Sequence, residues 1–482
     1  MSRGTWAGVA ALTLLAFVLR LAQLQQSLFG DELFLYAIVA HHDLGHVLSA
    51  VHDTESTPPL HFVLAWAIGK IGDPTVWIRL PPLLAGTALV PATFALGRRT
   101  VGERAGLFAA AVMTIAPFTI FYGTEARAYA TLGLLSVLST LALLKALDDR
   151  DRGRRRWWIA FAALTLAILY THYAGVFVVA AQGAWAAWRH RDRLRPLALS
   201  YAAAAIGFAP WIPSLVFQSH DSAAARIEQI YPLTVESALR GMLEVVPGHP
   251  LFPLASLPGK AWTAAFVALL AVTVAVALLA TLRRPTTDRA TSPSPKRLEL
   301  LAVLAIATPA GAILFSLGPQ SVYLPRNLMP SLPAAAVLLG AAVSHTGRRT
   351  APVLAALLLA VIAVGAAKTF EAEHKRPPYR EVADYIERRA APGDTVVEVA
   401  IYSRPPLGLS PYLDRKIPLR RFQRGAALAT STKHRLFLMV PQVGPLQGTP
   451  KLPELRGLRT ISARTFRSGG PLAVFEYRRA PG

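Results

Sequence analysis

The sequence contains no cysteine, which excludes disulfide bonds, thiolate catalysis and metal sites with cysteine ligands. Acidic residues are also scarce, with 28 Asp and Glu against 50 Lys and Arg, and only 16% of the 482 residues are charged. Hydrophobic residues make up 53% of the chain, and the mean hydropathy is +0.40. This composition excludes an ordinary soluble domain and predicts a polytopic membrane protein.

The net charge of +22 is of the size seen in nucleic-acid-binding proteins, but the basic residues are distributed in short clusters between apolar runs and in a C-terminal tail. Such clusters follow the positive-inside pattern of membrane topology and do not form a DNA-binding face. We therefore expect the lipid bilayer as a partner, and no nucleic acid.

About 11 apolar runs approach the roughly 20 residues that a helix needs to cross a bilayer. They cover residues 6–24, 79–97, 105–122, 127–147, 157–172, 173–188, 196–217, 260–282, 298–317, 330–345 and 351–368. The basic clusters place the N-terminus in the cytoplasm and the tail outside the plasma membrane. Because the N-terminus and the next basic cluster are both expected in the cytoplasm, an even number of spans must lie between them. The half-length apolar run at 60–69 is therefore expected not to cross.

The tail differs in composition from the rest of the chain, and we expect a domain boundary between residues 368 and 369. Apolar residues recur at helical spacing from Tyr379 to Ala390. Strands are predicted at 395–400, 434–440 and 472–477. The expected fold is thus an all-α polytopic membrane domain, 1–368, followed by a small extracytoplasmic α/β domain, 369–482.

Adjacent carboxylates, Asp31 and Glu32, follow the first apolar run, in a predicted outer loop at residues 25–60. Ionisable residues at this place are costly unless they serve a function. Asp31 could also simply cap a helix that begins with Glu32. The loop leads into Glu55-Ser-Thr-Pro-Pro-Leu-His61, whose prolines fix the direction of the chain as it re-enters the membrane. We take this loop as the chemical centre.

Other polar residues fall at further outer-face turns. Glu125 and Arg127 could form an ion pair with each other, or could help to hold a phosphate, because a guanidinium donates two parallel hydrogen bonds. Arg326 could reach toward the interface or pair with a lipid-linked phosphate. The remaining candidates, also at outer ends of predicted spans, are Arg79, Tyr129, His172, Tyr173 and Tyr323.

Two histidines raise the question of a metal. His42 and His46 have i, i+4 spacing, and Asp31 or Glu55 could complete a site with them. An interfacial or structural role explains the histidines more simply, since no tight metal signature is present. We expect no required cofactor, and a divalent metal is left open without support.

The order of these motifs resembles the GT-C membrane glycosyltransferases, specifically the family 39 and protein O-mannosyltransferase-like branch. The resemblance covers the membrane portion and is carried by Gly-Asp31-Glu32, Glu55-x-x-Pro-Pro-Leu-His61, Arg79-Leu-Pro, Glu125-Ala-Arg127-Ala-Tyr129, Thr-His172-Tyr173 and Tyr323-Leu-Pro-Arg326. One departure is that the family often has a lysine near the Pro-Pro element, whereas Lys70 lies farther along and position 61 is His.

The resemblance implies that the membrane domain transfers a sugar, mannose-like or a pentose, from a polyprenyl-phosphate carrier, with inversion. The acceptor hydroxyl would lie outside the cytoplasm, on a protein, a glycolipid or a polysaccharide. Asp31 would be the catalytic base, with Glu32 beside it, and the other motif residues would bind substrate. A phosphate leaving group needs charge stabilisation, which Arg326, with Arg127 or Arg79 as lesser candidates, would supply. The alternative is a transporter or flippase, which should show a midplane site and internal repeats.

Overall fold

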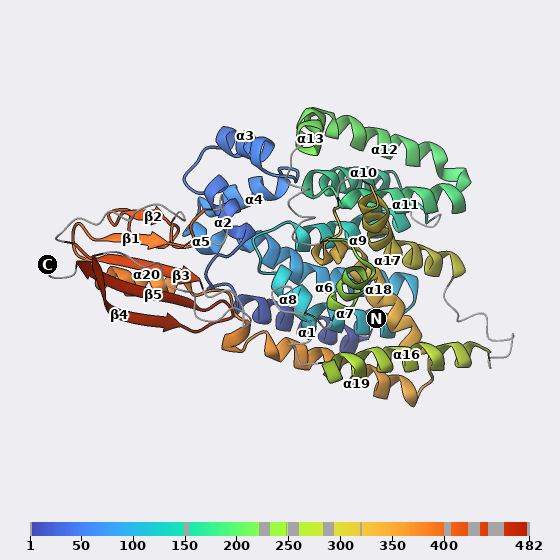
Figure 1. Cartoon of the computed structure of the whole chain (residues 1–482). Coiled ribbons are helices and arrows are strands. Elements are labelled where there is room, and N and C mark those ends of the chain that lie inside the picture. Colours follow the sequence, from blue (N-terminus) through green and yellow to red (C-terminus); the bar gives the residue numbers. More distant parts are fainter. Residues whose placement is uncertain are drawn as a thin grey trace.

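The computed structural model describes residues 2–148, 154–220, 232–246, 248, 260–282, 294–318, 321–399, 406–422, 434–441 and 457–479. In this part of the chain a helical bundle carries a five-stranded sheet at one end (Figure 1). Seven helical segments are long and apolar enough to cross a membrane: Arg3–Leu21, Pro74–Thr100, Tyr129–Ala146, Arg191–Ser219, Pro295–Ser316, Pro325–His345 and Thr350–Lys368. The predicted fold class is confirmed, whereas the count of about 11 spans stays a prediction.

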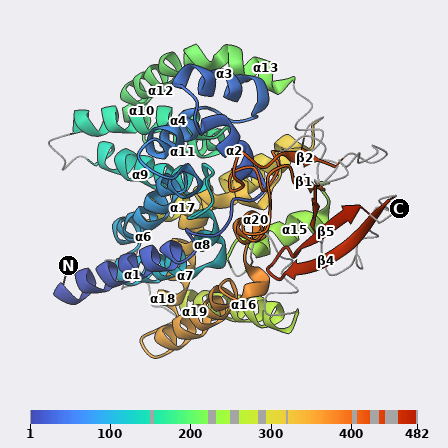
Figure 2. The ribbon, with the colours of Figure 1, turned by 90° about the vertical axis from the view of Figure 1, so that its left-hand side faces the viewer.

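The helices follow the apolar runs closely. Helices that each match one run are α1 (Arg3–Leu21), α6 (Leu80–Thr100), α9 (Tyr129–Ala146), α10 (Arg154–Thr171), α11 (Gly175–Arg189), α16 (Lys260–Leu282), α17 (Pro295–Ser316), α18 (Leu332–His345) and α19 (Thr350–Lys368). The run at 196–217 is divided into α12 (Leu194–Phe208), η2 (Ala209–Trp211) and α13 (Ile212–Ser219). In Figure 2, α12 and α13 lie at one edge of the bundle, and α16 and α19 lie at the opposite edge.

The run at 105–122 is interrupted, because Pro117 ends α7 (Glu103–Ile115) and begins α8 (Pro117–Tyr122). A proline has no N–H to donate to the carbonyl four residues earlier and forces the residue before it out of the helical region. The Met113 carbonyl instead accepts from the Arg20 guanidinium at 3.1 Å and from the Thr119 hydroxyl at 2.9 Å. This fully buried arginine of α1 thus stabilises the bend that leads into the turn at 123–128.

Four short helices form the segment predicted as the first outer loop, and its return: α2 (Asp31–Val39), α3 (Leu44–Thr54), α4 (Leu60–Gly69) and α5 (Pro74–Trp77). Asp43 caps α3 by accepting from the His46 N–H at 2.8 Å. The 10 residues of α4 extend only about 15 Å, half of the hydrocarbon core, so this helix is too short to cross. In Figure 1, α2, α4 and α5 lie at the end of the bundle next to the sheet.

The sheet has the order β2-β1-β3-β5-β4. Its strands are β1 (Thr395–Glu398), β2 (Leu419–Arg421), β3 (Leu436–Pro441), β4 (Leu458–Phe466) and β5 (Leu472–Arg479). β1 pairs in parallel with β2 and β3, and the other two pairs are antiparallel. Helix α20 (Tyr379–Glu387) buries Val382 and Ile386 completely in the core beside this sheet.

Strands β1, β3 and β5 match the three predicted strands, although their ends differ slightly. For example, β3 begins at Leu436, and position 400 lies outside the described residues. Sequence reasoning missed β2, which has only three residues, and β4, which is mostly exposed and shows no regular alternation. The structure does not test the predicted boundary at 368/369, which stays a prediction.

The absence of native cysteine allows a clean test of the predicted topology. Ser49, Ser410 and Thr350 are exposed, and the charge pattern puts the first two outside and the third inside. In intact cells, Ser49→Cys and Ser410→Cys should react with a membrane-impermeant maleimide, and Thr350→Cys should react only after permeabilisation. Labelling of Thr350→Cys together with protection of Ser410→Cys would invert the topology.

Candidate active site

Asp31 is the first residue of α2 and follows Gly30, whose φ of 57° favours glycine. One of its carboxylate oxygens lies 2.6 Å from Nη1 of Arg326 and 3.9 Å from Nε of Arg127. The Asp31 side chain is 30% exposed. The structure therefore brings together residues from three distant parts of the sequence around a carboxylate that solvent can reach.

The two arginines have further partners in the same cluster. Nη1 of Arg127 lies 3.3 Å from Oε2 of Glu55, the residue that ends α3. Arg326 belongs to η5 (Pro325–Ser331), and its guanidinium lies 5.6 Å from the centre of the Tyr129 ring. A mutual pair of Glu125 and Arg127 is one of the two sequence-based alternatives, and in the structure Arg127 pairs with Glu55 and Asp31 instead.

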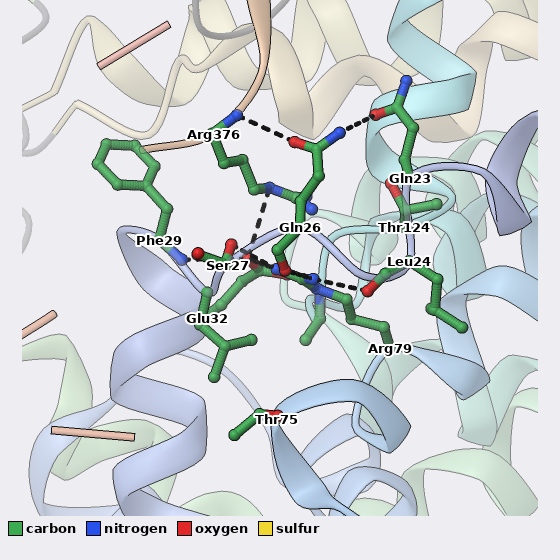
Figure 3. A network of polar contacts seen from close by, with 12 residues as sticks. Gln23, Leu24, Gln26, Ser27, Phe29, Glu32, Thr75, Arg79, Thr124 and Arg376 are labelled. Atoms are coloured by element: carbon green, nitrogen blue, oxygen red, sulfur yellow. Dashed lines mark hydrogen bonds and ion pairs between the residues drawn. The ribbon is translucent and has the colours of Figure 1, made fainter. Parts of the chain in front are cut away.

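Glu32, adjacent to Asp31 in the chain, has a different environment (Figure 3). Its carboxylate accepts two hydrogen bonds from Arg79, at 2.7 and 2.6 Å, and neither side chain is exposed. It also accepts from the backbone N–H groups of Ala126 at 2.9 Å and Phe29 at 3.2 Å. Such a saturated, buried carboxylate has no room for a substrate.

Arg79 directs its remaining hydrogen bonds to the backbone of the first outer loop. It donates to the carbonyls of Leu24 and Ser27, each at 2.9 Å, and to that of Gln26 (Figure 3). Arg79 precedes α6, and Glu32 lies in the first turn of α2. Their ion pair thus joins the loop that carries Asp31 to the beginning of a long helix.

Two of the predicted site residues, Glu125 and His61, have buried polar atoms without a hydrogen-bond partner among the described residues. Oε2 of Glu125 and both ring nitrogens of His61 have no hydrogen-bond partner in the described ranges, and both side chains are buried. The His172 ring lies 5.5 Å from the Tyr129 ring, and its Nδ1 accepts from the Ala174 N–H at 3.1 Å. These side chains offer polar atoms for a ligand.

The hydroxyls of Tyr173 and Tyr323 form hydrogen bonds with neighbouring helical segments. Tyr173 donates to Gln218 at 2.6 Å and accepts from Trp211 at 3.1 Å, which connects it to α13 and η2. Tyr323 donates to the Ala238 carbonyl of α15 (Val235–Glu244) at 2.8 Å. Their hydroxyls therefore stabilise neighbouring helices.

The histidines considered for a metal lie in the first outer loop, where the His42 and His46 rings stack at 3.9 Å. Among the residues that the structure describes, no three His, Asp or Glu side chains gather closely enough to hold a metal ion. The pair thus lacks a third ligand of this type in that part of the chain.

Sequence reasoning missed a contribution from the C-terminal segment. Nε of Arg376 lies 3.5 Å from Oε2 of Glu32, and its side chain is 2% exposed (Figure 3). The Tyr412 hydroxyl accepts from the Leu28 N–H at 2.6 Å. The one local signal was the Pro377-Pro378 pair after Arg376, which marks a fixed change of chain direction.

The charges around Asp31 control its ionisation. Burial raises the pKa of Asp31, but Arg326 and Arg127 outweigh that effect and hold the pKa below its ordinary value. Asp31 is thus a carboxylate at neutral pH, able to accept a proton, while its pairing with Arg326 restrains its basicity.

Comparison with known proteins identifies the fold. ArnT from Cupriavidus metallidurans, bound to undecaprenyl phosphate, superimposes with a TM-score of 0.58 at 14% identity, over 98% of each chain. The archaeal oligosaccharyltransferase AglB from Archaeoglobus fulgidus, in complex with an inhibitory peptide and a dolichol-phosphate, gives 0.51 at 13% identity, over 83% of this chain and 62% of that one. No curated protein matches the chain. The fold is that of the GT-C membrane glycosyltransferases.

Within that fold, residues 56–217 match the family described as dolichyl-phosphate-mannose-protein mannosyltransferase. The match begins just after Glu55 and includes Arg79, Glu125 and His172, whereas Asp31 and Arg326 lie outside it. The resemblance to the protein O-mannosyltransferase-like branch, predicted from the order of motifs, is confirmed, and the chain is a multi-pass membrane protein.

Glu125 should make stability depend on pH. Burial, together with the charges of Asp31 and Glu32, raises the pKa of Glu125 from its ordinary value of 4.5 to about 7. The folded state favours the protonated form, so this stabilisation is complete below about pH 4.5 and is lost as the pH rises through about 7. Glu125→Gln removes this dependence.

The measurement is the midpoint of thermal unfolding in detergent at pH 5 and pH 8.5. The gain of Glu125→Gln over the unmodified protein should be larger at pH 8.5. Glu236→Gln, at an exposed position of α15, is the matched control and should show no such difference. An equal effect of Glu125→Gln at both pH values would contradict the expected ionisation of Glu125.

Proposed function

We propose that this protein is a membrane glycosyltransferase that moves a sugar from a polyprenyl-phosphate carrier to an acceptor hydroxyl on the outer face of the plasma membrane. The observation that supports it most directly is the part-exposed Asp31 carboxylate between Arg326, at 2.6 Å, and Arg127, at 3.9 Å. This reaction requires a base beside cations that can bind a phosphate, and arginine suits that role. The similarity to ArnT, which was solved with undecaprenyl phosphate, supports the same donor class.

In the proposed reaction Asp31 accepts the proton of the acceptor hydroxyl while the acceptor oxygen attacks the anomeric carbon of the donor. The bond from that carbon to the phosphate oxygen breaks, and its electron pair remains on the phosphate. The products are a glycoside with inverted configuration, polyprenyl phosphate and a protonated Asp31. The leaving phosphate is already weakly basic, so the cations stabilise its charge and no strong acid is needed.

The Asp31–Arg326 pair also leads us to propose that the donor binds before the acceptor reacts. A donor phosphate that pairs with Arg326 competes with Asp31 for the same guanidinium. Because the charge of Arg326 helps to hold the pKa of Asp31 low, losing that contact makes the carboxylate a stronger base. The donor thereby prepares the base before the acceptor reacts.

The other residues have distinct proposed roles. The free polar atoms of Glu125 and His61 would hydrogen-bond the sugar or the phosphate. Tyr129 and His172 would form an aromatic wall beside Arg326, and Glu55 would fix Arg127. Glu32 and Arg79 would hold the loop in place rather than contact substrate. We propose no required metal or other cofactor, and a mannose-like sugar or a pentose as the transferred group.

A direct test uses the purified protein in nanodiscs with a panel of polyprenyl-phosphate mannoses and pentoses. Membranes of the source cells supply protein, glycolipid and polysaccharide acceptors. We expect radiolabelled sugar to pass from one donor to an acceptor. If a folded preparation transfers none of them yet moves the lipid between leaflets, the transporter alternative is correct.

Asp31→Asn should reduce turnover by about two to four decades, because the amide keeps the size of the side chain but cannot accept the proton. Undecaprenyl phosphate should bind at least as tightly, since Arg326 loses its competing carboxylate. Asp43→Asn is the matched control, because asparagine also caps a helix well. Near-normal turnover in Asp31→Asn, with loss in Glu55→Gln or Glu32→Gln, would assign the base elsewhere.

Arg326→Ala should weaken undecaprenyl phosphate binding by on the order of 2 to 4 kcal/mol, the cost of losing a charge-assisted contact to a desolvated phosphate. Arg326→Lys should recover only part of this, because a point charge replaces the planar fork. Arg240→Ala, at an exposed arginine of α15, serves as the control for binding measured by titration in nanodiscs. Unchanged affinity in Arg326→Ala would remove Arg326 from the phosphate site.

A further inference from the structure

The first outer loop is held between two parts of the chain that are far apart in sequence. From the membrane side, Arg79 binds the Glu32 carboxylate and the carbonyls of Leu24 and Ser27. From the other side, the segment after α19 supplies Arg376, Arg380 and Tyr412. The contacts of these three residues are the basis for proposing that the C-terminal segment contributes to the activity proposed above.

Arg376 contacts both Gln26 and Glu32 of the loop (Figure 3). Its backbone N–H donates to Oε1 of Gln26 at 2.9 Å, and its side chain lies 3.5 Å from Glu32 and 4.9 Å from the centre of the Phe121 ring. Burying an arginine is costly unless a charge compensates it, and Glu32 is the carboxylate in contact. The loop therefore takes this conformation around the Arg376 side chain.

Arg380 and Tyr412 extend the same contact. The Arg380 N–H donates to the Ser27 hydroxyl at 3.0 Å, and its guanidinium donates to Thr75 at 2.8 Å. The Tyr412 hydroxyl accepts from the Leu28 N–H, and its ring packs against both the core of the α/β region and the apolar cluster of α2 to α4. Residues 26–28 are thus bound one after another.

The turn that carries Tyr412 is itself fixed from within the sheet. Glu398, at the end of β1, accepts from the N–H groups of Gly408 at 2.7 Å and Leu409 at 3.0 Å. Tyr412, three residues after Leu409, is thereby oriented toward Leu28. The sheet, the turn and the outer loop form a continuous chain of hydrogen bonds that ends three residues before Asp31.

We propose that Arg376 and Tyr412 are positioning residues for the base: docking of the C-terminal segment sets the conformation of residues 26–32 and so places Asp31 opposite the donor. Neither residue contacts Asp31, Arg127 or Arg326 in the described structure, so each acts through the loop. The proposal rests on the proposed function for its effect on turnover, but not for its effect on the loop.

The test uses the full-length protein in nanodiscs and two readouts. Tyr412→Phe removes only one hydroxyl, so it should fold, and Arg376→Gln removes the charge beside Glu32. Hydrogen exchange of the amides in 26–32 should become about tenfold faster in both variants, as expected for the loss of one hydrogen bond in Tyr412→Phe and of one buried charge contact in Arg376→Gln. Arg420→Gln, an exposed position on β2, should leave exchange unchanged.

The second readout separates positioning from donor binding. Turnover should fall about tenfold or more in Arg376→Gln, with undecaprenyl phosphate affinity within about threefold of the unmodified protein. Arg376→Lys should recover part of the turnover, because it keeps a charge beside Glu32. Unchanged exchange in both variants, or a loss of donor affinity equal to the loss of turnover, would overturn the proposal. If the unmodified protein shows no transfer, the proposed function fails, and the exchange measurement still decides this one.

Discussion

The buried ion pair of Glu32 and Arg79 is the interaction on which the rest of the site depends. Two charges without solvent contact are stable only when every lone pair and N–H finds a partner. Arg79, Arg376 and two backbone amides supply those partners for Glu32, and three carbonyls do so for Arg79. The pair joins α2, α6, the turn at 123–128 and the C-terminal segment.

This arrangement explains how adjacent carboxylates can have opposite environments. Side chains at successive helical positions point about 100° apart. Glu32 therefore faces inward and is saturated by hydrogen bonds, while Asp31 faces the solvent-accessible cluster and is 30% exposed. The firmly held Glu32 fixes the position of the neighbouring Asp31, as supporting residues do around a reactive group.

Sequence reasoning captured the features that depend on local patterns. Apolar runs located the membrane helices, and the short run at 60–69 predicted α4. Residue type and position also selected Asp31, Arg127 and Arg326, which the fold brings into contact. Hydropathy could not reveal that Arg79 and Glu32 are partners, because both look like isolated charges near span ends. Strand β4, which shows no regular alternation, and the contact of Arg376 with Glu32 depend on tertiary structure alone.

The contact between Gln26 and Arg376 joins positions 350 residues apart. During synthesis the first outer loop leaves the ribosome long before its partner, and contacts of such separation close late. The loop can therefore reach its final conformation only after the segment that carries Arg376 has been synthesised. On the proposed role of Arg376, a truncated or stalled chain would stay catalytically silent in the membrane, so biosynthesis itself would delay activity until the whole polypeptide is in place.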